Sequence, residues 1–412
     1  MSIACALVFG SGCYLSHRRP PRPDASAPDA GDAGLDARVD LSFDAGTDGG
    51  RPIIPEAGAV TVPCEPDRAL LLPSGTPPPP CETRGGDHDR DGFDDAIDCN
   101  DCSAQINPGA FDFPGNDVDE DCSGADDLPC DDTGLPVEVG APPDALRAMG
   151  LCQRTTPSDR RWGVLDARFT TADGTGEPAD LRQLGVLPEL GGFSPVAGSR
   201  MLAISTSFAR APMRPSMPVC FDHDVVGGFP PGFPVDAPAC PGVVTGEVHD
   251  SVALEVRLRA PTNARAFSFA SAFYTHEYPD FICSPFNDVF TVLQSRSGGL
   301  ENIVFDADGN PVTVNTGLLQ VCTPGRHGGR RFRCELGATT LLGSGYEIGC
   351  DGFAREGAGA STGCIETSSS TEPGAIITLR FAIWDSGDGQ LDSLALIDNF
   401  QWIPMAFESI AR

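Results

Sequence analysis

Alternation of hydrophobic and polar residues marks the C-terminal half of the chain. Residues 252–258 carry Val or Leu at every second position, with Ala, Glu or Arg between them, which is the pattern of a half-buried strand. Similar short runs occur at 266–274, 289–294, 376–384 and 394–402, and turn residues separate them. Many short strands without alternating helices predict a mainly β fold, with a jelly-roll-like β-sandwich as the C-terminal body.

A helical signal is confined to a short segment before this body. Residues 144–149 follow Pro142-Pro143, and Gly150 stops the run, so the sequence predicts a short helix capped by Asp144. We assign residues 131–197 to a connecting segment that contains this helix and begins the β body.

The N-terminal sixty residues differ in composition from the rest of the chain. An apolar run at 3–9 and the sequence Gly10-Ser11-Gly12-Cys13 resemble a bacterial lipoprotein leader, here residues 1–17, which implies a lipidated Cys13. An ordinary apolar N-terminus is the alternative. Residues 18–60 are rich in Pro, Ala, Asp and Gly and hold too few large apolar side chains for a core. This composition predicts a disordered linker that acts as a tether.

The charge of the chain restricts its partners. Its 412 residues include 58 acidic and 28 basic side chains, and the net charge is -30. Every basic residue is Arg, and the arginines are scattered singly or in pairs. Nucleic acid and anionic membrane surfaces are therefore poor partners, and we expect membrane contact only through an N-terminal lipid.

Sixteen cysteines favour an oxidising compartment. Fourteen of them lie between Cys64 and Cys364, an even number that suits a framework of disulfides. Zinc is the alternative for clustered thiols, but Cys99-x-x-Cys102 lacks a second pair of the same spacing. We therefore predict a disulfide-rich protein that is extracellular or displayed at the cell surface or outer membrane.

A twelve-residue acidic loop, 87–98, carries the strongest chemical signal. Carboxylates at its positions 1, 3, 5, 9 and 12 and Gly92 at position 6 follow the arrangement that wraps a calcium ion, and position 7 would supply a backbone carbonyl. The predicted ligands are Asp87, Asp89, Asp91, Phe93, Asp95 and Asp98. The prolines at 77–80 rule out the entering helix of an EF-hand. A solvated acidic linker is the alternative.

The acidic pattern continues beyond this loop. Asp98-Cys99-Asn100-Asp101, Ile106-Asn107-Pro108-Gly109-Ala110 and Asp119-Glu120-Asp121-Cys122-Ser123-Gly124 resemble the MopE-type metal-binding motif of bacterial surface proteins over about 85–127. The resemblance implies a compact acidic unit, within a module at 61–130, and adds Asp119 and Asp121 as ligands. Cys102 departs from the family pattern, and Cys81 or Cys130 is its expected partner.

The identity of the metal follows from the type of donor atom. All the predicted ligands are oxygens, and His88 is the only imidazole in the window. Oxygen donors favour Ca2+ over copper, which needs imidazole or softer ligands, although the name of the family points to copper.

The C-terminal body, 198–404, contains Glu277-Tyr278-Pro279-Asp280, Phe286-Asn287-Asp288-Val289-Phe290 and Ala382-Ile383-x-Asp385-Ser386-Gly387-Asp388. Through these residues it resembles, over about 198–402, the choice-of-anchor L domain of bacterial surface proteins. The resemblance implies surface attachment. Four cysteines fall in loops of this match and are interpreted as local staples: Cys322, Cys334, Cys350 and Cys364.

Two further groups of acidic residues lie within this body. Asp385, Asp388 and Asp392 are spaced for a second structural calcium, and ordinary turn chemistry is the alternative. A second group consists of Glu277, Asp280, Asn287 and Asp288, which would line a ligand or metal surface, and a structural turn is the alternative.

The sequence contains no GxSxG, HExxH, phosphate-binding or dinucleotide-binding motif. We expect a non-enzymatic surface protein that combines a Ca2+ module with an adhesion or ligand-binding sandwich, whose ligand is an envelope or extracellular molecule such as a glycan. One alternative is a secreted hydrolase acting on polysaccharide, with its acid and base among Glu277, Asp280 and Asp288. A copper-binding surface protein is the other.

Overall fold

A computed structural model describes residues 71–80, 85–213, 220–350 and 357–405, together with the backbone of three short N-terminal strands. Cys13 and the predicted leader lie outside the described residues. The chain divides into two units, Met1–Ile53 and Ile54–Arg412. In the first unit, β1 (Thr47–Asp48) and β2 (Arg51–Pro52) pair with each other in antiparallel fashion. All other elements belong to the second unit.

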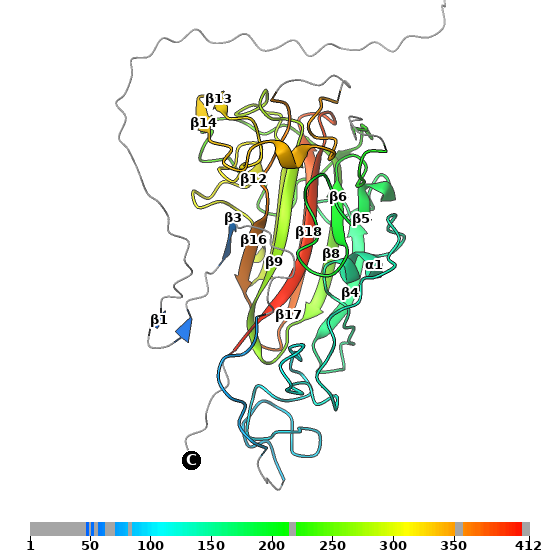
Figure 1. Cartoon of the computed structure of the whole chain (residues 1–412), viewed down its shortest axis with the longest axis vertical. Coiled ribbons are helices and arrows are strands. Elements are labelled where there is room, and N and C mark those ends of the chain that lie inside the picture. Colours follow the sequence, from blue (N-terminus) through cyan, green and yellow to red (C-terminus); the bar gives the residue numbers. More distant parts are fainter. Residues whose placement is uncertain are drawn as a thin grey trace, which may run out of the picture. The chain divides into compact units, whose positions relative to one another are not determined.

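Two antiparallel sheets form the body of the second unit (Figure 1). The strand order of the first sheet is β11-β10-β17-β8-β4, and β12 and β7 extend it. Its strands are β4 (Gly163–Thr170), β7 (Val226–Gly227), β8 (Val248–Arg259), β10 (Val289–Arg296), β11 (Gly299–Asn302), β12 (Val312–Thr313) and β17 (Ile376–Ser386). Every pairing in this sheet is antiparallel.

The second sheet has the strand order β3-β16-β9-β18-β6-β5, and β15 pairs with β9. Its strands are β3 (Ala57–Thr61), β5 (Leu184–Leu187), β6 (Met201–Ser205), β9 (Ala264–Thr275), β15 (Ala360–Ser361), β16 (Ile365–Ser370) and β18 (Ser393–Pro404). Long strands that follow one another in sequence, such as β17 and β18, lie in opposite sheets. The prediction of a mainly β fold is confirmed, and the predicted runs at 266–274, 289–294, 376–384 and 394–402 lie within β9, β10, β17 and β18.

The core lies between the two sheets because alternate residues of each strand face the same side. In β17, Phe381 and Ile383 belong to the main core cluster, which Phe290 of β10 and Ile397 of β18 also join. Trp384, between the inward positions of β17, faces the outer side and packs against Phe233 with ring centroids 5.0 Å apart. The alternation predicted at 252–258 identified the core-facing side of β8, whose Val252 and Leu254 belong to the main core cluster.

Helix α1 (Pro142–Ala148) is the predicted short helix, but its N-terminus differs from the prediction. Ala141 is the N-cap residue and makes no side-chain capping bond, while Asp144 lies in the first turn. Two prolines at the first helical positions preset the backbone, so no capping side chain is needed there. Gly150, at a φ of +91°, follows the helix as expected of a terminating glycine. The two short 3-10 helices are η1 (Leu181–Gln183) and η2 (Thr339–Leu341).

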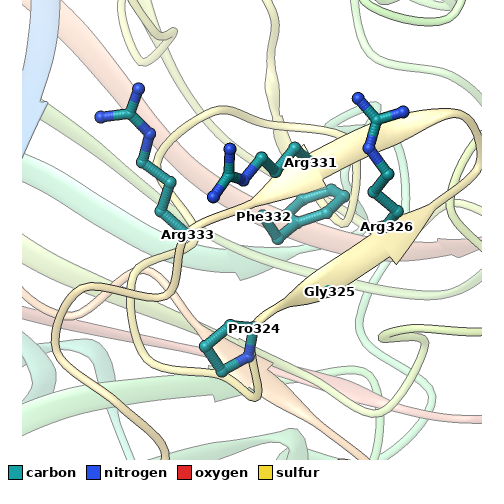
Figure 2. Close-up of a pocket in the computed structure, with 6 residues that line it drawn as sticks. All are labelled: Pro324, Gly325, Arg326, Arg331, Phe332 and Arg333. Atoms are coloured by element: carbon teal, nitrogen blue, oxygen red, sulfur yellow. The ribbon is translucent and has the colours of Figure 1, made fainter.

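A separate hairpin joins β13 (Gly325–His327) to β14 (Arg330–Phe332) (Figure 2). Arg326 lies opposite Arg331 in the register, and Arg333 follows two residues later, so the strand period places all three on the same face. Phe332 is buried on the opposite face. These residues, with Pro324 and Gly325, line a hollow of about 410 Å³.

Some disulfides join cysteines that are close in the sequence, and others join loops that are far apart in it. The described residues form the disulfides Cys99–Cys122, Cys130–Cys152, Cys220–Cys350, Cys240–Cys283 and Cys322–Cys334. The prediction of a local staple is confirmed for Cys322 and Cys334, which are 12 residues apart. It is wrong for Cys350, whose partner lies 130 residues away, because the fold brings two distant loops together. Cys102 is also disulfide-bonded, and not to Cys130.

Candidate metal centre

The acidic loop keeps its shape through bonds between its own side chains and backbone. Oδ1 of Asp91 accepts a hydrogen bond from the Phe93 amide at 2.8 Å, and Oδ1 of Asp98 accepts one from the Asn100 amide at 2.8 Å. Asp residues favour such local bonds, which turn the chain tightly without helix or strand. Gly92 has a φ of +96°, so the sixth position needs the conformational freedom of glycine.

Three of the predicted ligands converge. Asp89, Asp91 and Asp98 each contribute one carboxylate oxygen to a group whose atoms all lie within 4.8 Å of one another. An overlapping group joins Asp87 and Asp89 to Asp101. Asp101 was not predicted as a ligand because it lies beyond the twelve-residue loop, although it immediately follows the Asp-Cys-Asn sequence at the end of that loop.

The two other predicted positions of this loop face different surroundings. Oδ2 of Asp95 accepts a hydrogen bond of 2.7 Å from the Gly85 amide, and the side chain belongs to neither group. The Phe93 side chain is buried, and the guanidinium of Arg160 lies 4.2 Å from its ring centre. Phe93 thus anchors the loop through its side chain, and coordination by its carbonyl stays a prediction.

Unsatisfied oxygens mark the centre of the first group. The Oδ2 atoms of Asp89, Asp91 and Asp98 are buried and have no hydrogen-bond partner, and the same is true of Oδ1 of Asn100. Buried polar atoms are almost always paired in proteins, so four unpaired oxygens in one loop call for a missing partner. Because all four are acceptors, that partner must be a donor or a cation.

Electrostatics in this group are unfavourable without a cation. Burial, with a smaller contribution from the neighbouring carboxylates, raises the pKa of Asp91 to about 6 and that of Asp98 to about 7. The pKa of Asp89 is raised by the same causes. A bound cation would reverse this effect, because it favours the ionised form of each carboxylate.

A second acidic group lies further along the chain. Asp112, Asp119 and Asp121 each place one oxygen within 4.8 Å of the others, and Oδ1 of Asp112 is buried without a hydrogen-bond partner. Burial and the adjacent Glu120 raise the pKa of Asp112 to about 8. The sequence predicted Asp119 and Asp121 but missed Asp112. Its position between two phenylalanines, Phe111 and Phe113, was the available signal of a buried carboxylate.

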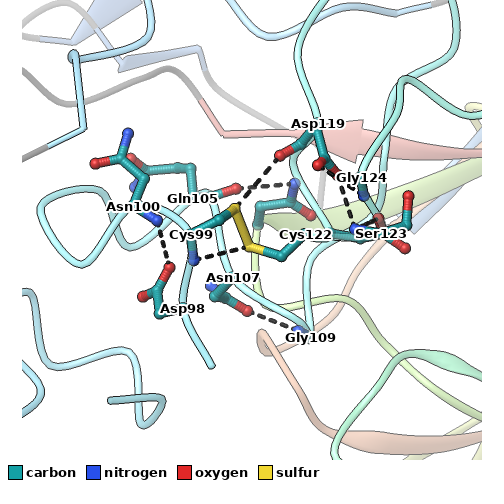
Figure 3. The surroundings of a disulfide bond; sticks show 12 residues. Asp98, Cys99, Asn100, Gln105, Asn107, Gly109, Asp119, Cys122, Ser123 and Gly124 are labelled. Atoms are coloured by element: carbon teal, nitrogen blue, oxygen red, sulfur yellow. Dashed lines mark hydrogen bonds between the residues drawn. A yellow bond between two sulfur atoms is a disulfide. The ribbon is translucent and has the colours of Figure 1, made fainter. Parts of the chain in front are cut away.

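A disulfide connects the two acidic groups (Figure 3). Cys99 follows Asp98 of the first group, and its partner Cys122 follows Asp121 of the second. The carboxylate of Asp119 accepts backbone hydrogen bonds from Ser123 at 2.8 Å and Gly124 at 2.9 Å, beside this disulfide. The bond therefore holds two acidic segments 23 residues apart against their mutual repulsion.

The acidic module is docked on the β-sandwich. Asn263, in the turn between β8 and β9, accepts a hydrogen bond from the Phe111 amide at 2.8 Å and donates one to the Phe111 carbonyl at 2.8 Å. The neighbouring Thr262 donates from its hydroxyl to Oδ1 of Asn107 at 2.8 Å. The module and the sandwich thus share partly buried polar contacts.

The acidic residues predicted within the sandwich are divided between its interior and its surface. Asp385 and Asp392 are fully buried, whereas Asp388 is half-buried. Glu277 and Asp288 are also buried, and the Asp288 amide donates a 2.9 Å hydrogen bond to Oε2 of Glu277. Asn287 is buried and Asp280 is exposed, so the predicted ligand surface is not continuous.

Cysteine does not contribute to any of these centres. Two further groups combine Asp98 with Cys99 and Cys122, and His276 with Cys220 and Cys350. The sulfur atoms in both groups are held in disulfides and are not available as thiolates. The donors of the acidic module are therefore oxygen atoms.

A comparison with protein families agrees with this geometry. Residues 98–127 match the family model of the MopE copper-binding type, described as a "Putative metal-binding motif". The match contains Asp98, Asp112, Asp119, Asp121 and the Cys99–Cys122 disulfide, and it begins at the last position of the predicted calcium loop. No curated protein and no solved structure matches the chain. In the part of the chain that the structure describes, no helix is both long and apolar enough to cross a membrane. The chain therefore carries a MopE-type metal-binding motif, a feature that suits a secreted or surface protein.

Proposed function

We propose that the acidic module binds Ca2+ and is ordered by it. The observation that carries this proposal is the cluster of unpaired buried oxygens from Asp89, Asp91 and Asp98. Residues 85–127 contain fourteen acidic side chains and one arginine, Arg90, so the module repels itself in the absence of a cation. Binding of Ca2+ and folding of this module are then linked.

The donor set favours calcium over copper. Carboxylate and amide oxygens are the ligands of Ca2+, whereas copper prefers imidazole and sulfur. His88, the only imidazole of the module, lies with Nδ1 3.0 Å from Oδ2 of Asp101 and is half exposed. Copper is the alternative metal, and tight Cu2+ binding that survives an excess of Ca2+ would favour it.

Titration of the full chain with Ca2+ tests the proposal. After treatment with a chelator, calorimetry should detect Ca2+ binding, and Asp91→Asn and Asp98→Asn should weaken it at least about tenfold because each removes a converging carboxylate. Asp95→Asn is the matched control, since Asp95 belongs to neither group and should leave the affinity within about twofold. Absence of heat and of ordering at millimolar Ca2+ would refute the proposal.

The sandwich, in this proposal, is a non-enzymatic ligand-binding domain displayed at the surface. The resemblance to a choice-of-anchor L domain and to a lipoprotein leader with Cys13 as its lipidated residue supports display through an N-terminal lipid. The hydrolase alternative receives less support, because Glu277 and Asp288 are buried and joined by a backbone hydrogen bond. Glycosidase carboxyls instead flank a bound sugar across an open cleft.

A specific observation favours an anionic glycan as the ligand. Arg326 and Arg331 lie directly opposite each other on the β13–β14 hairpin, and neither pairs with a carboxylate among the described residues. Like charges in that position destabilise a hairpin, so an anion between them would relieve the repulsion. Two guanidinium groups beside a hollow suit the carboxylate or sulfate groups of an acidic polysaccharide.

Binding to an acidic polysaccharide tests this second role. Immobilised polygalacturonate should retain the full chain at low salt, and Arg326→Gln with Arg331→Gln should abolish that retention. Arg257→Gln is a suitable control because Arg257 is an exposed arginine on β8 outside the hairpin. Equal retention of all variants would contradict the assignment of this surface.

A further inference from the structure

The inward-facing rows of both sheets change from apolar to acidic at one end of the sandwich. In β17, the inward row that contains Ile383 continues to Asp385. In β10, the row that contains Phe290 leads back to Asp288, one residue before the strand. The register pairs Val289 with Trp384, so its continuation places Asp288 beside Asp385.

The opposite sheet supplies further polar groups at the same end. Ser393, the first residue of β18, donates a hydrogen bond from its hydroxyl to Oδ2 of Asp288 at 2.6 Å. Asp392 precedes it and is fully buried. Glu277 follows β9, and its Oε2 accepts the Asp288 amide at 2.9 Å. Four carboxyl groups from two sheets therefore meet in the interior.

No described basic side chain compensates these four groups. None of Glu277, Asp288, Asp385 and Asp392 forms an ion pair with an arginine of the described residues. The contrast with Glu255 is informative, because two arginines form ion pairs with that partly buried carboxylate. Burying an uncompensated carboxylate is costly, so these four groups need another partner.

Unpaired atoms are directed into this space. Asp385 is fully buried beside Asp288 and Thr206, and neither of its oxygens completes a hydrogen bond with them. Oδ1 of Asp392 is likewise buried without a partner. The hydroxyl of Ser207 faces Asp392 without completing a hydrogen bond, and Ser207 has no exposed surface. Buried polar atoms are almost always paired in proteins, so these atoms call for a partner.

The electrostatic consequence of burial agrees with this conclusion. Burial, increased by the mutual repulsion of the carboxylates, raises the pKa of Asp385 and of Asp392. Burial also raises the pKa of Glu277. A cation among these groups would favour their ionised form and so oppose this effect of burial.

We propose that a Ca2+ ion lies between the two sheets at this end, held by Asp288, Asp385 and Asp392, with Glu277 supporting Asp288. Two of these ligands, Asp385 and Asp392, were predicted from the sequence. The third is Asp288, and the predicted Asp388 is not among the ligands. The donor atoms are carboxylate oxygens, and the hydroxyl of Ser207 adds another, which suits a hard cation. Such an ion joins the sheets by bonds that neither sheet provides alone.

The nearby histidine does not change the class of metal. His276 is buried, stacks on Tyr346 with ring centres 4.3 Å apart, and lies beside the Cys220–Cys350 disulfide. Burial lowers the pKa of His276 to about 3, so its ring is neutral and does not offset the carboxylates. No thiolate is available there, because both sulfur atoms are bonded to each other.

This site is separate from the acidic module. The module contacts the turn before β9, and the four carboxyl groups lie beyond the other end of that strand. A strand of 12 residues spans about 40 Å, so the two sites lie too far apart to share a ligand. The proposed internal ion does not depend on Ca2+ binding by the module.

Counting bound Ca2+ in the full chain tests the proposal. The background variant carries Asp91→Asn, Asp98→Asn and Asp112→Asn to inactivate the module. After treatment with chelator at pH 7.5 and equilibrium dialysis against radioactive Ca2+, we expect the background chain to retain one equivalent. Addition of Asp385→Asn should remove it. A background chain without bound Ca2+, or an Asp385→Asn chain that retains the equivalent, would overturn the proposal.

A matched control and a second measurement separate binding from folding. Asp398 is also a buried carboxylate, but its oxygens accept hydrogen bonds from the amides of Val196 and Asn399, so Asp398→Asn should leave the bound Ca2+ unchanged. If Asp385→Asn does not fold, thermal unfolding of the background chain tests for the proposed Ca2+ site instead. Hundredfold excess of Ca2+ over its Kd should raise Tm by about 5 °C, and an unchanged Tm would refute the site.

Discussion

The hydroxyl of Ser393 donates a 2.6 Å hydrogen bond to Oδ2 of Asp288, and this bond joins the two sheets. Ser393 begins β18 in one sheet, and Asp288 immediately precedes β10 in the other. Both residues are buried. At this end of the core, a polar contact therefore takes the place of the apolar packing that holds the rest of the sandwich together.

Removal of that hydroxyl should destabilise the sandwich. Ser393→Ala leaves a buried carboxylate oxygen of Asp288 without its donor, at a cost of about 1–3 kcal/mol. Urea unfolding of the full chain measures the change in free energy. Ser158→Ala, in an exposed loop, is the control and should change it by less than about 0.5 kcal/mol. Equal stability of the two variants would show that the contact between the sheets contributes nothing.

We expect the hydrogen bonds between Asn263 and Phe111 to hold the acidic module on the sandwich. Asn263→Ala removes the hydrogen bonds to both backbone groups of Phe111, and we expect a loss of about 2–3 kcal/mol. Trp162, whose ring centre lies 5.0 Å from that of Phe111, provides a fluorescence probe of docking. Thr262→Ser keeps the hydroxyl that contacts Asn107 and should cost less than about 1 kcal/mol. An unchanged fluorescence and stability in Asn263→Ala would contradict this prediction.

The disulfide between the acidic groups should matter for metal binding. Replacing Cys99 and Cys122 by Ser removes a cross-link over 23 residues, worth about 3 kcal/mol in the chain-entropy description. Ca2+ must then order a looser acidic segment, so its affinity should fall at least about tenfold. Calorimetric titration measures this change. The same substitution at Cys322 and Cys334 should leave Ca2+ affinity intact, and a similar loss in both variants would argue against a specific role.

The raised pKa values predict opposite responses to pH with and without calcium. The pKa is raised to about 7 in Asp98 and to about 8 in Asp112, and in the unfolded chain both carboxyls return to ordinary values near 4. Without metal, the folded state binds more protons between these limits, so stability should fall as pH rises from about 4 to 8. Thermal unfolding in chelator should show this decline.

Calcium should reverse that trend in the module because it holds the carboxylates ionised. The gain in Tm on adding Ca2+ should therefore grow from pH 5 to pH 8, as fewer protons compete for the oxygens of Asp91 and Asp98. Thermal unfolding at matched pH with Ca2+ and with chelator gives the difference directly. A gain that is independent of pH would mean that these carboxylates do not bind the ion.

The sequence by itself determined the strands and part of the metal centre. The alternation at 252–258 identified β8, whose Val252 and Leu254 lie in the core, because strand periodicity is local. The spacing of Asp89 and Asp91 placed them in one group for the same reason. Because Asp89 and Asp91 are two residues apart in a tight loop, few conformations of the loop would point their side chains in different directions.

Only the tertiary structure decided the partners of residues far apart in the chain. Asp112 joins Asp119 and Asp121 through a fold that the Cys99–Cys122 disulfide helps to close. Asp288 and Asp385 are 97 positions apart in the sequence, and the register of β10 and β17 places them side by side. Spacing in sequence carries no information about such pairs, since strand register and chain topology are set by packing of the whole core.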